Sequence, residues 1–316
     1  MLLTFQITIE EPCQALKKVN ESSNMWVFWA LLSAILVASR RPFEKKVINQ
    51  LHHFTYGFLV QCVSLPILAT IVIINGKLLN PLILGTRFWV PLIIISIGFP
   101  PLNTYLYKHA IKNGELSKVL PIQSLWPVLT LLLAWITLGE KPSIIASGGV
   151  LLTVLGIYAL GLKGKRLHHP LQPFREDSSS RAMLASVLLI TAVGIFEKIA
   201  VKESNPLFYS LSSSIGALLT LSVAMRISKQ RITASMRPFA KKLCLIGALQ
   251  STTYATYLLA IASGPIAYVS ALRGTNILFG SILGVLIFKD KLTKSNVISF
   301  ALIIAGAIGL ALGTSK

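Results

Sequence analysis

Long runs of apolar residues alternate with short polar segments along most of the chain. Each run is close to the roughly 20 residues that an α-helix needs to cross about 30 Å of hydrocarbon. No run alternates with the two-residue period of a barrel strand, and hydrocarbon cannot satisfy open backbone groups, so each run is predicted to be a helix. The ten predicted spans are residues 26–46, 56–75, 88–108, 116–138, 143–162, 182–202, 207–226, 242–262, 265–288 and 293–312.

The connections between the runs are short, except for the basic segment 163–181 near the centre of the chain. Residues 1–24 lack the basic start and the long apolar core of a signal peptide, so they are predicted to be a disordered or surface-lying tail, or to precede a true start at Met25. The domains are therefore this tail, a first unit 25–162, the linker 163–181 and a second unit 182–312.

The two units resemble each other. A shift of 150 positions aligns residues 107–162 with 257–312 without a gap, and eleven of the 56 aligned pairs are identical. The triplet Phe-Glu-Lys recurs late in the first run of each unit, at Glu44 and Glu197, 153 positions apart. An odd number of helices per unit makes the copies inverted in the membrane, as in many transporters. The predicted fold class is an all-α integral membrane protein with ten transmembrane helices in two inverted five-helix repeats.

Composition agrees with lipid as the solvent, because 53% of residues are hydrophobic and only 13% are charged, against roughly a quarter charged in soluble domains. The net charge of +19 is spread over the connections, which indicates topology signals and contacts with anionic lipids, with no nucleic acid as partner. The three cysteines form no CxxC pair, and the loop histidines lack a carboxylate or cysteine cluster, so neither a metal nor a cofactor is expected.

The segment "QSLWPVLTLLLAWITLGEKPSIIASGGVLLTVLGIYALG" has a proline in the fourth helix, Leu138-Gly139-Glu140 in the following turn and a glycine-rich fifth helix. It resembles the EamA domain of the drug/metabolite transporter superfamily. The second copy resembles it more weakly, with Lys289-Asp290 in the turn. The resemblance covers about residues 25–312. It implies a central cavity built mainly from the first four helices of each half, with helices five and ten at the periphery.

Arg273 lies eight residues into the ninth predicted helix, roughly 12 Å from its start. An arginine at that depth costs roughly 2.5–3.5 kcal/mol on insertion scales, so it should face a cavity or a partner. Its repeat counterpart is Gln123. We interpret both as substrate-binding candidates, and a structural ion pair is the alternative for Arg273.

Further polar and aromatic residues fall at helical spacing on the third, fourth, eighth and ninth runs, so each set can point inward together. Hydrogen bonding between helices is the alternative to lining a substrate path. These additional candidates are Asn103, Tyr107, Trp126, Gln250, Tyr254, Tyr257 and Asn276.

Glu44 and Glu197 are the two acidic residues placed within spans away from a connection. A membrane carboxylate can exchange a proton, and small multidrug-resistance relatives within the superfamily use a first-helix glutamate in this way. Here each glutamate lies later in its helix, directly before a lysine. The alternative to proton coupling is a Glu–Lys pair near the interface, with the lysine reaching toward water.

These patterns predict a secondary transporter, a permease or exporter in a bacterial inner membrane, that moves a small polar or amphipathic metabolite. An acid-bearing substrate is favoured because no deep carboxylate is evident to pair with Arg273. A proton-coupled multidrug or cation exporter and a non-transporting membrane or lipid-handling protein are the alternatives. No enzyme is expected, because neither an ATP-binding GxxxxGK[ST] nor an HExxH motif occurs.

Both monomer and homodimer remain open, as do import or export, the coupling ion and the orientation. Charge placement favours termini outside the cell, whereas the superfamily generally has them in the cytoplasm.

Overall fold

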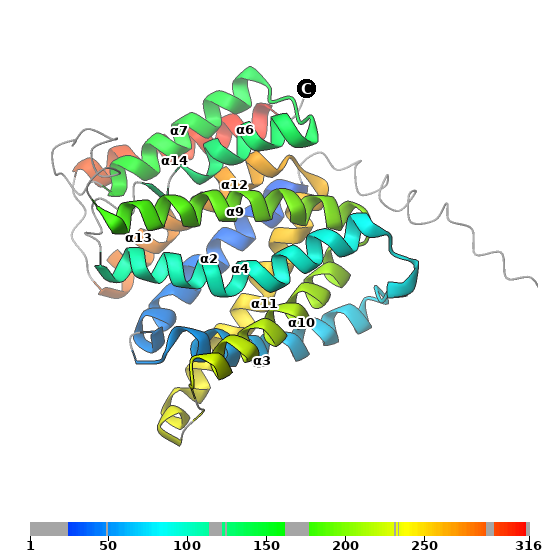
Figure 1. Cartoon of the computed structure of the whole chain (residues 1–316). Coiled ribbons are helices and arrows are strands. Elements are labelled where there is room, and N and C mark those ends of the chain that lie inside the picture. Colours follow the sequence, from blue (N-terminus) through cyan, green and yellow to red (C-terminus); the bar gives the residue numbers. More distant parts are fainter. Residues whose placement is uncertain are drawn as a thin grey trace, which may run out of the picture.

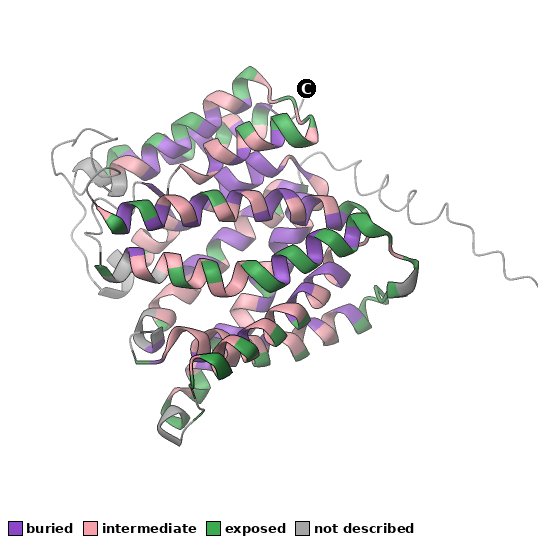
Figure 2. Ribbon diagram, in the orientation of Figure 1, coloured by how far each residue is buried: buried purple, intermediate pink, exposed green. Residues whose placement is uncertain are grey.

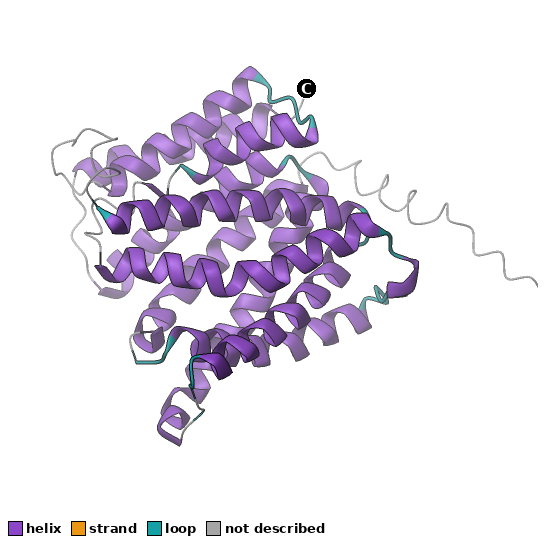
Figure 3. Cartoon of the chain, viewed as in Figure 1, coloured by secondary structure: helices purple, strands orange, loops and turns teal. Residues whose placement is uncertain are grey.

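The computed structural model describes residues 25–48, 50–113, 122–123, 125–161, 177–230, 232, 234–288 and 294–313. The predicted tail and most of the predicted linker lie outside these residues. Within them the regular structure is entirely helical (Figure 3). This agrees with the predicted all-α fold class.

The helices follow the order of the predicted spans, and most of their ends fall within three residues of the predicted ends. The ninth span is divided in two by a turn at Thr275. The α-helices are α2 Met25–Ile48, α3 His53–Ile74, α4 Thr86–Asn113, α6 Trp126–Leu138, α7 Ile144–Gly161, α9 Ser178–Lys202, α10 Pro206–Ile227, α11 Ala240–Ser263, α12 Ile266–Gly274, α13 Asn276–Phe288 and α14 Lys294–Gly313. Two short 3₁₀ helices, η1 Pro81–Ile83 and η2 Ala234–Phe239, lie in connections.

Six helical segments in the described residues are long and apolar enough to cross a bilayer. Three further apolar helices, Trp126–Leu138, Ile144–Ala159 and Val297–Gly313, are shorter. The chain is therefore an integral membrane protein by its helix content, whereas the count of ten spans stays a prediction.

Helix packing is related between the two repeats (Figure 1). The second helices α3 and α10 pack on each other, and so do the fifth helices α7 and α14. The first helix of each repeat packs on the third helix of the other, because α2 contacts α11 and α9 contacts α4. Exchanging the two repeats leaves this contact pattern unchanged, as expected for a duplicated unit that folds around a shared axis.

The helices run alternately up and down, so their ends define two faces. We call the face with Met25, Gly313 and the connections 75–85, 139–143, 203–205 and 264–265 the terminal face, and the other the distal face.

On the distal face, Asp177 begins α9 and accepts hydrogen bonds from the backbone of Ser179 and Ser180. Desolvation alone would raise the pKa of this carboxyl, but these hydrogen bonds outweigh it and hold the pKa below its usual value.

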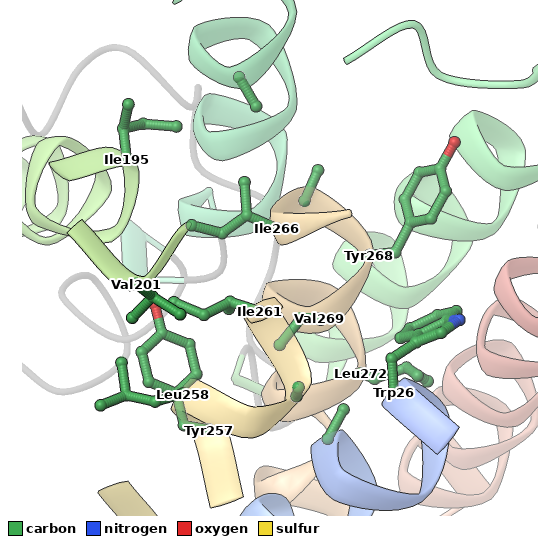
Figure 4. Packing of buried hydrophobic residues seen from close by; sticks show 14 of the residues in the cluster. Trp26, Ile195, Val201, Tyr257, Leu258, Ile261, Ile266, Tyr268, Val269 and Leu272 are labelled. Carbon is green, nitrogen blue, oxygen red and sulfur yellow. The ribbon is translucent and has the colours of Figure 1, made fainter. Parts of the chain in front are cut away.

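The main apolar core lies in the half of the bundle near the terminal face. It joins residues of α2, α4, α6, α7, α9, α10, α11, α12 and α14 in one cluster. Figure 4 shows the part of it that comes from α2, α9, α11 and α12. Nearer the distal face, the described buried residues form smaller separate clusters. Many large apolar side chains on the outside of the bundle are exposed (Figure 2), as expected for surfaces that face lipid.

The α7–α14 contact depends on glycine. A Cβ on Gly149 would lie 2.8 Å from both the Gly306 carbonyl oxygen and the Leu310 nitrogen. A Cβ on Gly313 would lie 2.7 Å from the Ala146 nitrogen. The two backbones therefore approach more closely than any side chain permits, which is the usual way that helices associate in lipid. Neither helix lines the central cavity described below, in agreement with the peripheral placement that the resemblance implies.

Gly149→Ala should destabilise the protein by about 1–3 kcal/mol, because the added methyl group meets backbone atoms that cannot move aside independently. Gly148→Ala is the matched control, since a Cβ at Gly148 meets nothing within 4 Å and the gain in helix propensity is the same. Thermal unfolding in detergent measures both variants. Equal midpoints for the two would contradict the close-packed interface.

Candidate functional site

A cavity of about 180 Å³ lies between α3 and α4 of the first repeat and α9, α10 and α11 of the second. Hydroxyl and amide side chains make up most of its lining, and Glu197 is its one ionisable carboxylate. The lining residues are Gln61, Ser64, Leu68, Ile95, Ser96, Phe99, Pro100, Asn103, Thr104, Glu197, Ser213, Ser214, Ala217, Gln250, Ser251 and Tyr254. Such a lining can hydrogen-bond a small polar solute that hydrocarbon would exclude.

Part of this hydrogen-bonding capacity is unused. The Ser96 hydroxyl is buried and has no partner among the described residues. Gln61, by contrast, donates to the Ser214 carbonyl oxygen (3.2 Å), which joins α3 to α10. Ser186 donates to the Asn103 side-chain oxygen (2.6 Å) and leaves the amide NH₂ of Asn103 available. The lining is thus held in place by bonds between helices and still presents groups that a solute could engage.

Glu197 lies at the terminal-face end of this cavity and is only 5% exposed. The Tyr254 hydroxyl donates to its Oε1 (2.7 Å) and also lies 3.1 Å from the Ser213 hydroxyl. The candidate Tyr254 of α11 and the coupling candidate Glu197 of α9 are therefore in direct contact. A buried carboxylate in an apolar bundle needs such donors, and this one obtains them from the second repeat alone.

Arg273 lies on the far side of the tyrosine pair from the cavity. Its guanidinium carbon is 4.3 Å from the centre of the Tyr257 ring and 5.8 Å from that of Trp126. Arg273 and Glu197 also interact electrostatically. Glu197 is thus a deep carboxylate within electrostatic reach of Arg273, which the sequence did not reveal. Position along one helix hides this, because α9 and α12 bring their charged residues to similar depths from opposite directions.

The helices α6 and α13 begin at equivalent positions in the two repeats. α6 begins at Trp126 and α13 at Asn276, which are related by the shift of 150, and each follows a turn. Asn276 donates to the Arg273 carbonyl oxygen (2.6 Å) across this turn. The side-chain oxygen of Asn276 and the indole nitrogen of Trp126 are buried without partners among the described residues. The contact between the Arg273 guanidinium and the Trp126 ring connects the two turns.

Glu44 and Glu197 differ although they are repeat counterparts. Glu44 pairs with Arg40 (3.2 Å) and accepts from the Tyr56 hydroxyl (2.7 Å), and it does not line the cavity. The Glu–Lys interface pair considered for Glu197 is wrong, because Lys198 is buried and pairs with Glu140 instead. Of the two proton-coupling candidates, the structure brings Glu197 alone to the cavity.

The remaining candidates lie away from the cavity. Tyr107 packs against the distal cluster of Ala110, Ile122, Ala182, Met183 and Val187. Gln123 is half-buried just before Trp126 and is not part of the lining. Of the substrate-binding candidates, Asn103, Gln250 and Tyr254 line the cavity, whereas Arg273, Asn276, Trp126 and Tyr257 form the adjoining network.

Sequence reasoning missed several lining residues. Ser213 and Ser214 belong to the run Ser-Leu-Ser-Ser-Ser on α10, whose hydroxyl density in an apolar helix was an available signal. Tyr209 is not part of the lining but lies near Glu197, and it could have been found by the shift of 153 from Tyr56. Its hydroxyl is buried without a partner among the described residues and interacts electrostatically with Glu197.

Comparison with known proteins agrees with this architecture. The model of the EamA-like transporter family matches residues 24–162 and 181–312, which together are most of the chain. An "Uncharacterized transporter in cobO 3'region" from Sinorhizobium sp. is 29% identical over 140 residues, which are 42% of this chain and 99% of that protein. The match of a protein of about half the length is consistent with a duplicated unit.

A solved structure titled "Crystal structure of protein" resembles the chain in three dimensions, with a TM-score of 0.73 at 16% identity. The likeness covers 92% of this chain and 96% of that one. It supports the fold and carries no information on the solute.

Arg273→Met and Glu197→Gln should be coupled, because each variant removes the charge that partly compensates the other inside the bundle. We expect each single variant to lower the thermal midpoint, and the double variant to lose less than the sum, with a coupling of about 0.5–3 kcal/mol. Thermal unfolding of the four proteins in detergent measures this. Arg273→Met combined with Glu44→Gln is the control and should be additive, and additivity in both cycles would contradict the interaction.

Proposed function

Because this chain belongs to the EamA-like transporter family, we propose that it is a secondary carrier for a small polar solute and that the solute binds in the cavity beside Glu197. The observation that carries this proposal is a hydroxyl- and amide-lined cavity at the junction of the two repeats, with one buried carboxylate at its end. A site between inverted repeats can be exposed to either side by a movement of one repeat against the other.

The charge of the lining favours a solute that bears a protonated amine. Glu197 is the only charged residue among the described residues that line the cavity, whereas Arg273 lies over the rings of Tyr257 and Trp126 outside the lining. The preference for an acid-bearing substrate rested on an unpaired Arg273, and Glu197 removes that premise. A bare anion in the cavity would meet the carboxylate first, where repulsion is strong because water is scarce.

Glu197 would then serve as the coupling site. A carboxylate that holds either a proton or an amine cannot hold both, so each occupant displaces the other and the two gradients become linked. This is the proton-coupled alternative of the sequence analysis, now assigned to Glu197. A multidrug exporter with bulky cargo fits less well, since a cavity of about 180 Å³ limits the solute to a small metabolite.

A non-transporting membrane protein is the rival. It would have no use for a cavity lined by hydroxyl and amide side chains, in which the buried Ser96 hydroxyl has no partner among the described residues. We place the carrier in a bacterial inner membrane, with anionic lipids at the basic distal connections, as a monomer or homodimer.

Counterflow into reconstituted vesicles tests the proposal. The vesicles are preloaded with a mixture of small amines, amino acids, organic acids and neutral polyols, and each labelled solute is offered outside in turn. We expect accumulation of an amine-bearing solute that depends on the imposed pH gradient. Glu197→Gln should abolish the pH-driven accumulation, because the amide cannot exchange a proton.

Glu44→Gln is the matched control for this measurement. It is the repeat counterpart but lies outside the cavity, so pH-driven accumulation should persist. Accumulation of organic acids alone would restore the acid-bearing alternative. Counterflow of no solute by a monodisperse protein would contradict the carrier itself.

A further inference from the structure

A second polar cluster joins the two repeats at the terminal face and plays no part in the cavity. Glu140 follows α6 in the first repeat, and Lys198 lies near the end of α9 in the second repeat. The Lys198 ammonium pairs with Oε1 of Glu140 and donates to the Gly264 carbonyl oxygen (2.8 Å). Lys198 is only 5% exposed. A buried ammonium with two acceptors from two different connections fixes all three segments relative to one another.

Glu140 uses its second oxygen as well. Its Oε2 accepts from the backbone N–H of Ile266, the first residue of α12 (3.1 Å). Gly139 makes this reach possible, because it ends α6 with φ +66, in the left-handed region that glycine adopts without strain. The turn Leu138-Gly139-Glu140 is one of the features that resemble the EamA domain. Its physical role here is to direct the Glu140 carboxylate of the first repeat toward residues of the second repeat.

Neighbouring contacts join the repeats at the same face. The Ser143 backbone N–H donates to the Tyr268 hydroxyl (3.0 Å). Arg87 pairs with Glu203 (3.6 Å), and Asn205 donates to the Lys77 carbonyl oxygen (3.1 Å). These two latter contacts are exposed and contribute little. The buried Glu140–Lys198 pair is thus the strongest polar connection between the repeats at this face within the described residues.

The pair lies where a carrier would have to open. Between the cavity and the terminal face stands the main apolar cluster, which includes Leu258 and Ile261 of α11 and Ile266 of α12 (Figure 4). Those two helices meet at Gly264, the residue that Lys198 holds through its carbonyl oxygen. A solute could leave the cavity at the terminal face only if these segments separated, and separation would break the bonds of Lys198 and Glu140.

We propose that Glu140 and Lys198 form an inter-repeat latch that holds the terminal face of the cavity closed. In this structure both contacts of Lys198 are formed, so the latch is shut. Opening at the terminal face requires the pair to part, and the equilibrium between the two states depends on its strength. The latch concerns access to the cavity and does not depend on which solute the carrier moves.

Site-directed labelling tests the latch without a solute. Ser251 lines the cavity and is 1% exposed, and Ser251→Cys is a one-atom change that places a reporter there. The background replaces Cys13, Cys62 and Cys244 by serine. A membrane-impermeant maleimide is then applied from each side in turn, to intact cells and to inverted vesicles. The face that carries the C-terminus is identified by a tag after Lys316.

We expect labelling from the terminal face to be slow in the parent and to rise by roughly tenfold in Glu140→Gln and in Lys198→Met, because either change removes the ion pair. The double variant Glu140→Gln/Lys198→Met should show the same rise. It leaves no buried unpaired charge, so it keeps the test decisive if a single variant fails to fold.

Asp290→Asn is the matched control. Asp290 is the repeat counterpart of Glu140 in the sequence and follows the fourth helix that ends at the distal face. Its removal should not increase labelling from the terminal face. Unchanged terminal-face labelling in a folded double variant would overturn the proposal, and so would an equal rise in Asp290→Asn, which would indicate general loosening of the bundle.

Discussion

A charge inside hydrocarbon must find its partner within the protein, and this constraint organises the interior of the molecule. Glu197, Lys198 and Arg273 lie within helices of the second repeat, and none of them is left to face lipid alone. Glu197 obtains a tyrosine donor and the field of Arg273, whereas Lys198 obtains Glu140 and a backbone carbonyl. Because each partner comes from a different helix, satisfying the charges also determines how the helices are arranged.

The adjacent residues Glu197 and Lys198 illustrate how one helix can serve two purposes. Successive helical residues point about 100° apart, so α9 directs one charge into the central cavity and the next into the terminal-face connections. A rotation or shift of α9 would move both side chains at once. The cavity and the Glu140–Lys198 pair are therefore connected through a single helix.

The two repeats share a plan and differ in chemistry. Glu44 and Glu197 are counterparts, yet Glu44 lies outside the cavity, where it pairs with Arg40 and accepts a hydrogen bond from Tyr56. The fifth helices α7 and α14 pack on each other through glycines from both copies. Gly280 on α13 is different, because a Cβ at its position would have no neighbour within 4 Å. Packing that supports the bundle is preserved in both halves, and the buried charges Glu197, Lys198 and Arg273 all lie in the second. This asymmetry is expected where duplicated units keep a common scaffold and a single site.

The pattern of apolar runs was enough to predict the helical class, the order and most of the bounds of the helices, the duplication and the family, because lipid permits few backbone arrangements and a run of about twenty apolar residues is a strong signal. It also identified Tyr254, Gln250, Asn103 and Glu197 as candidates from polar residues in apolar runs. Only the tertiary structure decided which of them share a cavity, that Arg273 has Glu197 beside it, and that Lys198 belongs to Glu140. Helical periodicity orders residues along one helix, whereas charge pairing depends on the rotation and depth of neighbouring helices, which the packing of the whole bundle sets.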